Sequence, residues 1–322
     1  MEHDLAFDRG DFDRVRSLIY QRAGISLGDG KQAMVYSRLS RRLRDTGHAS
    51  FARYLQWLEH ESGEAAAVEW QEFVNCLTTN LTSFFREDHH FVALVDDLRA
   101  RSKSGLRIWC SAASTGEEPY SIAMTVAETL GANHGVKMVA SDIDTQVLAK
   151  AKLGVYPQDC RGLTPQRLHQ HFLRGKGPQE GYIRVKPELA RMIEFRAVNL
   201  MDARWSLGEP FDIVFCRNVM IYFDAATQLK VLEKMHACMK PGSLLYVGHS
   251  ENFTESRDLF RRALRRGRCQ SRHHVRRQVC AIICAGDERH FDQARDQRLA
   301  GRQANRLPDV VFVLVARVGA FE

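Results

Sequence analysis

Acidic residues follow two apolar runs of the chain, at positions where a ligand would bind if those runs form a parallel sheet. Asp142 follows the run 137–140, and Glu117 and Glu118 follow the small residues of 111–116. An acid at the end of a second strand commonly binds ribose hydroxyls in nucleoside-binding folds. The G-x-G-x-x-G pattern that cradles a pyrophosphate is absent. These residues favour a nucleoside ligand without phosphate, although an acid beside Pro119 also suits the first turn of a helix.

The elements that must position these acids alternate from residue 105 onward. Apolar strands are expected at 106–110, 137–140, 193–198, 211–216 and 243–248, with helices at 119–130, 145–153 and 225–239. This alternation predicts an α/β fold with a doubly wound parallel sheet. Residues 154–192 interrupt it with glycine, proline and an alternating run, which predicts a small antiparallel β insertion.

Residues 11–100 show helical spacing of apolar residues, which predicts an N-terminal all-α domain. The segment 31–44 has a stripe of apolar residues, and its charged side chains are all basic. We expect those side chains on its exposed face, either as a solvated surface or as a docking site for an acidic helix. They are Lys31, Arg38, Arg41, Arg42 and Arg44.

The composition indicates a globular protein whose basic character lies in its last segment. The 322 residues carry a formal net charge of +7, of which residues 261–322 contribute +8 through 14 arginines, no lysine and six acids. A nucleic-acid partner is therefore not expected for the first 260 residues. No run is long enough for a membrane span, and the acidic start is unlike a signal peptide, so we expect a cytoplasmic protein.

Cysteine usage gives no clear metal signature. Five widely spaced cysteines lie in apolar surroundings, which suits reduced thiols, and no C-x-x-C pair occurs. A cluster in the last segment could ligate a metal, but its spacing matches no justified pattern, and we predict no metal site. Its members are Cys269, His273, His274, Cys280 and Cys284.

Five long segments occur in order with consistent spacing. They are NLTSFFRE at 80–87, SAASTGEEPYSIAM at 111–124, SDIDTQVLAKA at 141–151, CRNVMIYFD at 216–224 and GHSEN at 248–252. Over roughly residues 5–260 the chain resembles the CheR family, the glutamate O-methyltransferases of chemotaxis receptors. The resemblance implies a Rossmann-like methyltransferase sheet that uses S-adenosylmethionine and releases S-adenosylhomocysteine. A sulfonium cofactor without phosphate agrees with the acids described above.

The resemblance also implies domain bounds and cofactor contacts. A receptor-docking helical domain would span 1–78, a linker and helix 79–104, and the methyltransferase domain 105–260 with its β-subdomain at about 154–192. Tyr222 matches the family tyrosine beside the transferred methyl group, and Arg86 would orient the substrate carboxylate. We choose Glu118 over Glu117 by motif alignment. The expected cofactor contacts are Asn80, Thr82, Arg86, Glu118, Asp142, Asn199, Leu200, Arg217 and Asn218.

The implied partners are methyl-accepting chemotaxis receptors. In this interpretation the basic segment 31–44 docks the methylation helices. The β-subdomain of some members adds a C-terminal receptor peptide as a further strand. The residues matching that segment are Arg174, Gly175, Gly177, Gly181 and Arg184. The chain is expected to act as a monomer.

Two alternative functions are open at this stage. A catalytically silent CheR-like interaction module is disfavoured because Arg86, Asp142, Asn218 and Tyr222 are all present. A nucleic-acid methyltransferase depends on the basic tail alone, and the (N/D)PP(Y/F) element of adenine methyltransferases is replaced by Asn218-Val219-Met220-Ile221.

The tail 261–322 departs from the family pattern, in which a short final strand completes the sheet. It is either a shifted reading frame or a lineage-specific extension. Its only expected strand-like run is 310–315.

Overall fold

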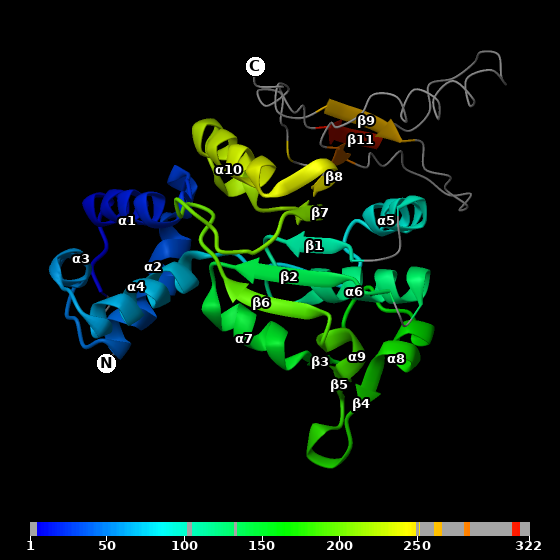
Figure 1. Ribbon diagram of the computed structural model, residues 1–322. Coiled ribbons are helices and arrows are strands. Elements are labelled where there is room, and N and C mark those ends of the chain that lie inside the picture. The colour runs from blue at the N-terminus through cyan, green and yellow to red at the C-terminus, as the bar shows by residue number, and fades with distance from the viewer. Residues whose placement is uncertain are drawn as a thin grey trace, which may run out of the picture.

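The computed structural model describes residues 5–101, 105–131, 134–248 and 251, together with the backbone of 261–265, 280–283 and 311–315. Helices of the N-terminal part lie beside one end of a central sheet (Figure 1). The tail cysteines and histidines considered as metal ligands lie outside the described side chains. Among the described residues, no helix is long and apolar enough to cross a membrane.

The N-terminal part is all α-helical, as expected. Its elements are α1 (Arg9–Ala23), the 3₁₀ turn η1 (Asp29–Lys31), α2 (Gln32–Asp45), α3 (Phe51–His60) and α4 (Glu64–Leu77). Asp8 begins α1 with a reciprocal capping box, and Gly24 ends it in the left-handed conformation. The apolar faces form a separate core that includes Phe12, Leu39 and Phe73.

The main sheet is parallel over five strands and confirms the expected doubly wound class. The strand order is β8-β7-β1-β2-β6, and neighbouring strands in it are parallel. The strands are β1 (Arg107–Cys110), β2 (Lys137–Asp142), β6 (Ile193–Ala197), β7 (Phe211–Cys216) and β8 (Met239–Val247). The helices are α5 (His89–Ala100), α6 (Glu117–Leu130), α7 (Thr145–Leu153) and α10 (Ala225–Ala237), with the 3₁₀ turn η3 (Met220–Tyr222).

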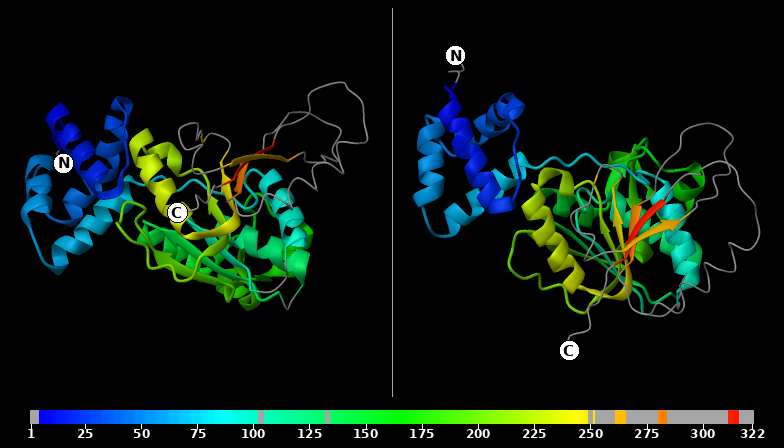
Figure 2. Two further views of the ribbon diagram at one scale, coloured as in Figure 1. Left: turned by 45° about the horizontal axis from the view of Figure 1, so that its top comes forward. Right: turned by 90° about the horizontal axis from the view of Figure 1, so that it is seen from above.

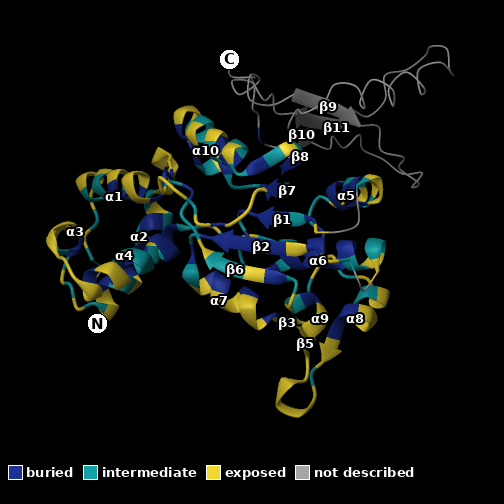
Figure 3. Cartoon of the chain, viewed as in Figure 1, coloured by how far each residue is buried: buried dark blue, intermediate teal, exposed yellow. Residues whose placement is uncertain are grey.

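Alternating side chains bury the two faces of this sheet in different cores. Ile108 and Ile213 point into the core that contains α5 and α6, whereas Trp109 and Val214 point into the core that contains α10. The central strands are buried almost throughout (Figure 3). The sheet is therefore packed against helices on both of its faces.

The fifth strand starts earlier than the sequence predicted. Helix α10 ends at Ala237, and β8 begins at Met239 rather than Ser243. The pairing of β7 with β8 shifts between Phe211 and Ile213, whose partners are Met239 and Leu244. Pro241 lies in the bulge that this shift creates, where a missing backbone N–H is tolerated.

The insertion is antiparallel, as predicted, with strand order β3-β5-β4. Its elements are β3 (Val155–Pro157), α8 (Pro165–His171), β4 (Phe172–Arg174), the 3₁₀ turn η2 (Gly177–Gln179), β5 (Tyr182–Val185) and α9 (Pro187–Ala190). The hairpin between β4 and β5 projects away from the main sheet (Figure 1).

The tail contributes three strands, so the expectation of a single strand-like run was wrong. They are β9 (Arg261–Arg265), β10 (Cys280–Ile283) and β11 (Val311–Val315). β10 pairs antiparallel with β8, whereas β11 pairs with β9 and β10 further out. The edge of β8 is therefore covered by 280–283 and not by the apolar run at 310–315.

Side-chain and backbone hydrogen bonds hold the helical domain against the carboxyl ends of the strands. Thr78 Oγ1 donates to Asp144 at 2.8 Å, and Tyr20 donates its hydroxyl proton to Asp224 at 2.6 Å. The backbone N–H of Ser26 donates to the carbonyl of Tyr222 at 2.8 Å. Figure 2 shows these helices at the same end of the sheet from two further directions.

Candidate functional site

A cavity lies between the helical domain and the carboxyl edge of the sheet. It brings together every residue that the sequence predicted as a cofactor contact, and it also includes Tyr222, which was predicted to lie beside the transferred methyl group. These are Asn80, Thr82, Arg86, Glu118, Asp142, Asn199, Leu200, Arg217, Asn218 and Tyr222. They come from the linker after α4, the first turn of α6, the end of β2, the loops after β6 and β7, and η3. Their individual roles toward a ligand stay predictions.

Asp142 ends β2 and is almost fully buried. Its two oxygens accept the backbone N–H groups of Ser114 at 2.8 Å and Asp144 at 3.0 Å. Burial raises its pKa to about 6 because the charged form loses hydration. These bonds fix the carboxylate at the cavity wall and leave lone pairs for further donors.

Arg217 follows β7, and its fully buried guanidinium connects three segments of the site. Its Nη1 pairs with Glu118 in the first turn of α6, and its Nη2 donates to the carbonyl of Arg86 at 2.7 Å. The same Nη2 lies 3.3 Å from Glu87 Oε2. Such a buried charge is tolerated because two carboxylates and a carbonyl surround it.

Glu118, which we chose over Glu117 as a cofactor contact, differs from it in where its side chain lies. Glu118 lines the cavity, whereas Glu117 accepts the hydroxyl of Thr115 at 2.6 Å within its own loop. Burial raises the pKa of Glu117. Glu118 also accepts the thiol of Cys110 at 3.4 Å, so that β1 and β7 both fix its position.

The linker residues are ordered by contacts with the sheet edge. Asn80 donates its amide to Asp144 at 2.8 Å, and its carbonyl accepts the hydroxyl of Ser114 at 3.0 Å. Arg86 Nη1 donates to the carbonyl of Leu81 at 2.8 Å. Arg86 therefore lies across a turn of the linker with its side chain at the cavity.

Asn199 and Leu200 follow β6 and form a further part of the cavity wall. The amide of Asn199 donates to the carbonyl of Arg22 in α1 at 2.7 Å. Leu200 is buried, and Val198 beside them adds apolar lining. This side of the cavity suits a flat apolar ring system, while the Asp142 side suits hydroxyl groups.

Four non-glycine residues with left-handed backbone lie around this site. They are Phe85, Glu87, Ser114 and Asn218, with φ between 48° and 59°. Such conformations are unfavourable for residues with a side chain and persist where surrounding contacts enforce them. The unfavourable backbone conformations therefore occur in the loops that carry the predicted contacts.

Sequence reasoning missed several residues of the site. Ser26 and Met34 of the helical domain line the cavity, and Glu87 joins Arg217 to Asn218. Lys31, predicted as a docking residue, also lines it. Glu87 lies within the segment 80–87 and could have been noticed there. The contribution of the helical domain has no local sequence signal, because it depends on docking.

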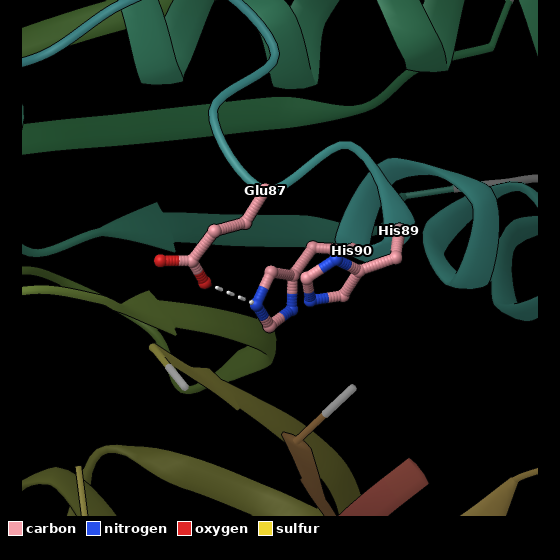
Figure 4. A group of neighbouring side chains, drawn as sticks. All are labelled: Glu87, His89 and His90. Atoms are coloured by element: carbon pink, nitrogen blue, oxygen red, sulfur yellow. Dashed lines mark hydrogen bonds and ion pairs between the residues drawn. The ribbon is translucent and has the colours of Figure 1, made fainter. Parts of the chain in front are cut away.

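Glu87, His89 and His90 form a cluster with atoms close enough to hold a metal (Figure 4). Burial lowers the pKa of His90 to about 3, so its neutral ring donates from Nε2 to Glu87 at 3.1 Å. The two histidine rings lie 4.4 Å apart, with an angle of 36° between their planes. The guanidinium of Arg217 beside Glu87 further opposes a cation. Glu87 and His89 are half-buried and His90 is buried, and Glu87 joins the His90 ring to the guanidinium of Arg217.

The predicted docking residues of η1 and α2 divide into two groups. Lys31, Arg41 and Arg44 are exposed. Arg42 instead pairs with buried Glu69, and Arg38 donates to the carbonyl of Thr78 at 2.7 Å. The expectation that all five lie on the exposed face was wrong for Arg38 and Arg42, because both satisfy groups of α4 and the segment just after it.

The predicted peptide-binding residues lie in and beside the hairpin of the insertion. Gly175 requires the absence of a side chain, since a Cβ would lie 1.9 Å from the carbonyl of Gln179. Gly177 and Gly181 have positive φ. Arg174 pairs in register with Ile183, next to Arg184, so the two arginines lie on opposite faces of the small sheet.

A parallel sheet with a cavity beyond its carboxyl ends and an acid after β2 defines a nucleoside-binding α/β protein. Two family models match the chain: "CheR methyltransferase, all-alpha domain" over residues 10–78 and "CheR methyltransferase, SAM binding domain" over residues 80–267. The chain belongs to the CheR methyltransferase family. Residues 268–322 lie beyond both matches.

Relatives in several bacteria support this assignment. The chain is 52% identical to the chemotaxis protein methyltransferase of Escherichia coli (strain K12) over 256 residues, covering 79% of this chain and 88% of the relative. It is 51% identical to chemotaxis protein methyltransferase 2 of Pseudomonas aeruginosa (strain PAO1), covering 79% and 91%. It is 34% identical to the chemotaxis protein methyltransferase of Borreliella burgdorferi (strain B31), covering 78% and 91%.

Proposed function

We propose that this protein methylates glutamate side chains of chemotaxis receptors with S-adenosylmethionine, producing glutamate methyl esters and S-adenosylhomocysteine. The observation that carries the proposal is the cavity that collects residues from four of the five family motifs at the carboxyl edge of the sheet. The matched SAM binding domain and the names of the relatives support it.

The residues of the cavity fit such a cofactor. Asp142 would accept the ribose hydroxyls, and Val198 and Leu200 would contact the adenine ring. Arg86 offers a cation for a carboxylate, while Glu118 and the linker carbonyls offer acceptors for an ammonium group. The lining has no G-x-G-x-x-G cradle, which agrees with a ligand that lacks phosphate.

The bound cofactor supplies a methyl carbon to which a glutamate oxygen bonds as the carbon–sulfur bond breaks and its electron pair passes to sulfur. A glutamate is already ionised at neutral pH, so the protein needs no general base. Its task is to exclude water and hold the carboxylate in line. Tyr222 and Arg86 at the cavity are placed to orient that carboxylate.

The test combines binding with turnover. We expect calorimetric titration of the full chain to show S-adenosylhomocysteine binding that Asp142→Ala loses, and transfer of radiolabelled methyl groups to receptor glutamates. A folded chain that binds no S-adenosylhomocysteine would overturn the proposal. A chain that binds it but transfers no methyl group would instead be a silent interaction module.

For receptor docking we propose the exposed basic residues of η1 and α2, namely Lys31, Arg41 and Arg44. Receptor methylation helices present glutamates, which complement this surface in charge. Lys31 also lines the cavity, so the surface continues to the cofactor site. This supports one continuous path for a substrate helix. We propose that the protein acts as a monomer and uses no nucleic acid.

For a C-terminal receptor peptide we propose the outer edge of β4, which is an edge strand of the small sheet. Leu173 of β4 exposes 49% of its surface there and would contact an added strand. A fluorescent receptor C-terminal peptide should bind the chain and lose binding to Gly175→Val. Equal binding by both chains would contradict this edge as the site.

A further inference from the structure

Glu251 follows β8 and is a buried carboxylate that lies outside the cavity lining. Only 8% of its surface is exposed. Its Oε1 accepts the backbone N–H groups of Val219 and Met220, each at 3.0 Å, and its Oε2 accepts that of Gly248 at 2.6 Å. One carboxylate therefore ties the end of β8 to the loop that follows β7.

That loop carries three of the predicted contacts. Arg217 and Asn218 precede the two N–H groups that Glu251 binds, and Tyr222 follows them by two residues. Asn218 has a φ of 59°, so its unfavourable backbone needs support from neighbouring residues. Gly248 permits the close approach, because a Cβ there would lie 2.8 Å from Asn218 Nδ2 and 3.2 Å from Glu251 Oε2.

We propose that Glu251 is a positioning residue for the methyltransferase, whose carboxylate fixes the backbone of 217–222 so that Arg217, Asn218 and Tyr222 meet the cofactor and the substrate glutamate. This inference rests on the proposed function. Glu251 acts through the loop and touches neither ligand.

The position requires a carboxylate, since both oxygens accept hydrogen bonds from N–H groups. A glutamine supplies one acceptor and one NH₂ group, so in either orientation a donor faces a donor. The unsatisfied buried N–H would shift the loop. The guanidinium of Arg217 favours the ionised form of Glu251, although burial raises its pKa to about 7.

The experiment compares Glu251→Gln with Asp212→Asn in the full chain. Asp212 is a matched control at the opposite end of β7, where it accepts the N–H of Arg107 at 2.8 Å and pairs with Lys240. Circular dichroism, calorimetric titration with S-adenosylhomocysteine and steady-state methyl transfer would be measured for both. We expect Glu251→Gln to weaken S-adenosylhomocysteine binding and raise the KM for S-adenosylmethionine roughly tenfold, with the receptor KM unchanged. Asp212→Asn should lower only the unfolding midpoint.

Unchanged affinity in a folded Glu251→Gln chain, or equal loss in both variants, would overturn the inference while the proposed function stands. A wild-type chain that does not bind overturns both. If Glu251→Gln fails to fold, Glu251→Asp tests the same contact, because it keeps two acceptor oxygens on a shorter side chain that reaches the three N–H groups less well. It should also weaken S-adenosylhomocysteine binding, and wild-type affinity there would overturn the inference.

Discussion

The side-chain amide of Asn218 donates a hydrogen bond to Glu87 Oε1 at 3.3 Å, and both residues have left-handed backbone. Glu87 ends the linker segment that carries Asn80, Thr82 and Arg86, while Asn218 follows β7. The contact therefore joins two loops that both carry residues of the cavity lining. Since Glu87 also binds Arg217 and His90, it connects the site to the buried network behind it.

The Arg217–Glu118 pair should be strongly coupled. Arg217→Met leaves Glu118 and Glu87 without their buried cation, and we expect it to lower the free energy of unfolding by about 3–5 kcal/mol. Glu118→Gln should be destabilising as well, and the double variant should lose less than the sum. Urea unfolding of the four chains measures this. Additive losses would show that the pair does not interact in solution.

Tyr222→Phe should separate binding from turnover. The ring remains to line the cavity, so S-adenosylhomocysteine affinity should stay within about twofold of wild type. Loss of the hydroxyl beside the reacting carboxylate should lower kcat roughly tenfold to hundredfold. Calorimetry and single-turnover methyl transfer test the two effects. An unchanged rate would remove Tyr222 from the proposed mechanism.

Asp142 should give opposite pH trends in stability and binding. Because its pKa rises from 3.8 to about 6 in the folded state, the folded chain holds this proton more tightly. Its contribution to stability therefore falls by about 3 kcal/mol as pH rises through that window. Affinity for S-adenosylhomocysteine should instead increase through about pH 6, as the carboxylate ionises.

The comparison with Asp142→Asn isolates this effect. Glu251, whose pKa is raised to about 7, titrates in both chains and cancels from the difference. Affinity and urea unfolding would be measured from below pH 4 to pH 8, so that the whole window from 3.8 to about 6 is covered. Parallel pH profiles of the two chains would refute the assignment to Asp142.

Asp144 should contribute more to the free energy of unfolding than a helix cap alone does. It accepts the N–H groups of Gln146 and Val147 at the start of α7, and also the side chains of Thr78 and Asn80. Thr164→Ala removes a cap from α8 alone and should cost about 1 kcal/mol. Asp144→Ala should cost about 3 kcal/mol and weaken S-adenosylhomocysteine binding. Equal losses in urea unfolding would mean that Asp144 does not link the two domains.

The exposed basic residues of α2 should affect receptor binding, whereas the inward-facing ones should affect stability. Arg41→Ala with Arg44→Ala should raise the receptor KM and reduce its salt dependence, with stability nearly unchanged. Arg42→Ala leaves Glu69 buried beside Tyr54 without its cation and should lower the free energy of unfolding by about 3 kcal/mol. Methylation assays across salt concentrations and urea unfolding distinguish them. A receptor KM unaffected by the double change would exclude this surface.

The sequence alone determined the class of the sheet and the edge at which the site lies. Apolar runs alternating with helical spacing specify parallel strands, and polar residues after those runs must meet at their carboxyl edge. Asp142 was predicted in this way from its position alone, whereas Asn199 and Arg217 were predicted from the resemblance to the CheR family. Local patterns also predicted the antiparallel insertion, because glycine and proline residues indicate its turns.

Only the tertiary structure decided which groups face one another across long separations. Arg42 and Arg44 are both basic residues of α2, yet only Arg42 turns inward, because Glu69 of α4 lies buried against it. The role of Glu251 depends on N–H groups of residues more than thirty positions earlier. The periodicity of the sequence predicts whether a side chain is buried but not which residue it contacts, because those contacts depend on how the elements dock.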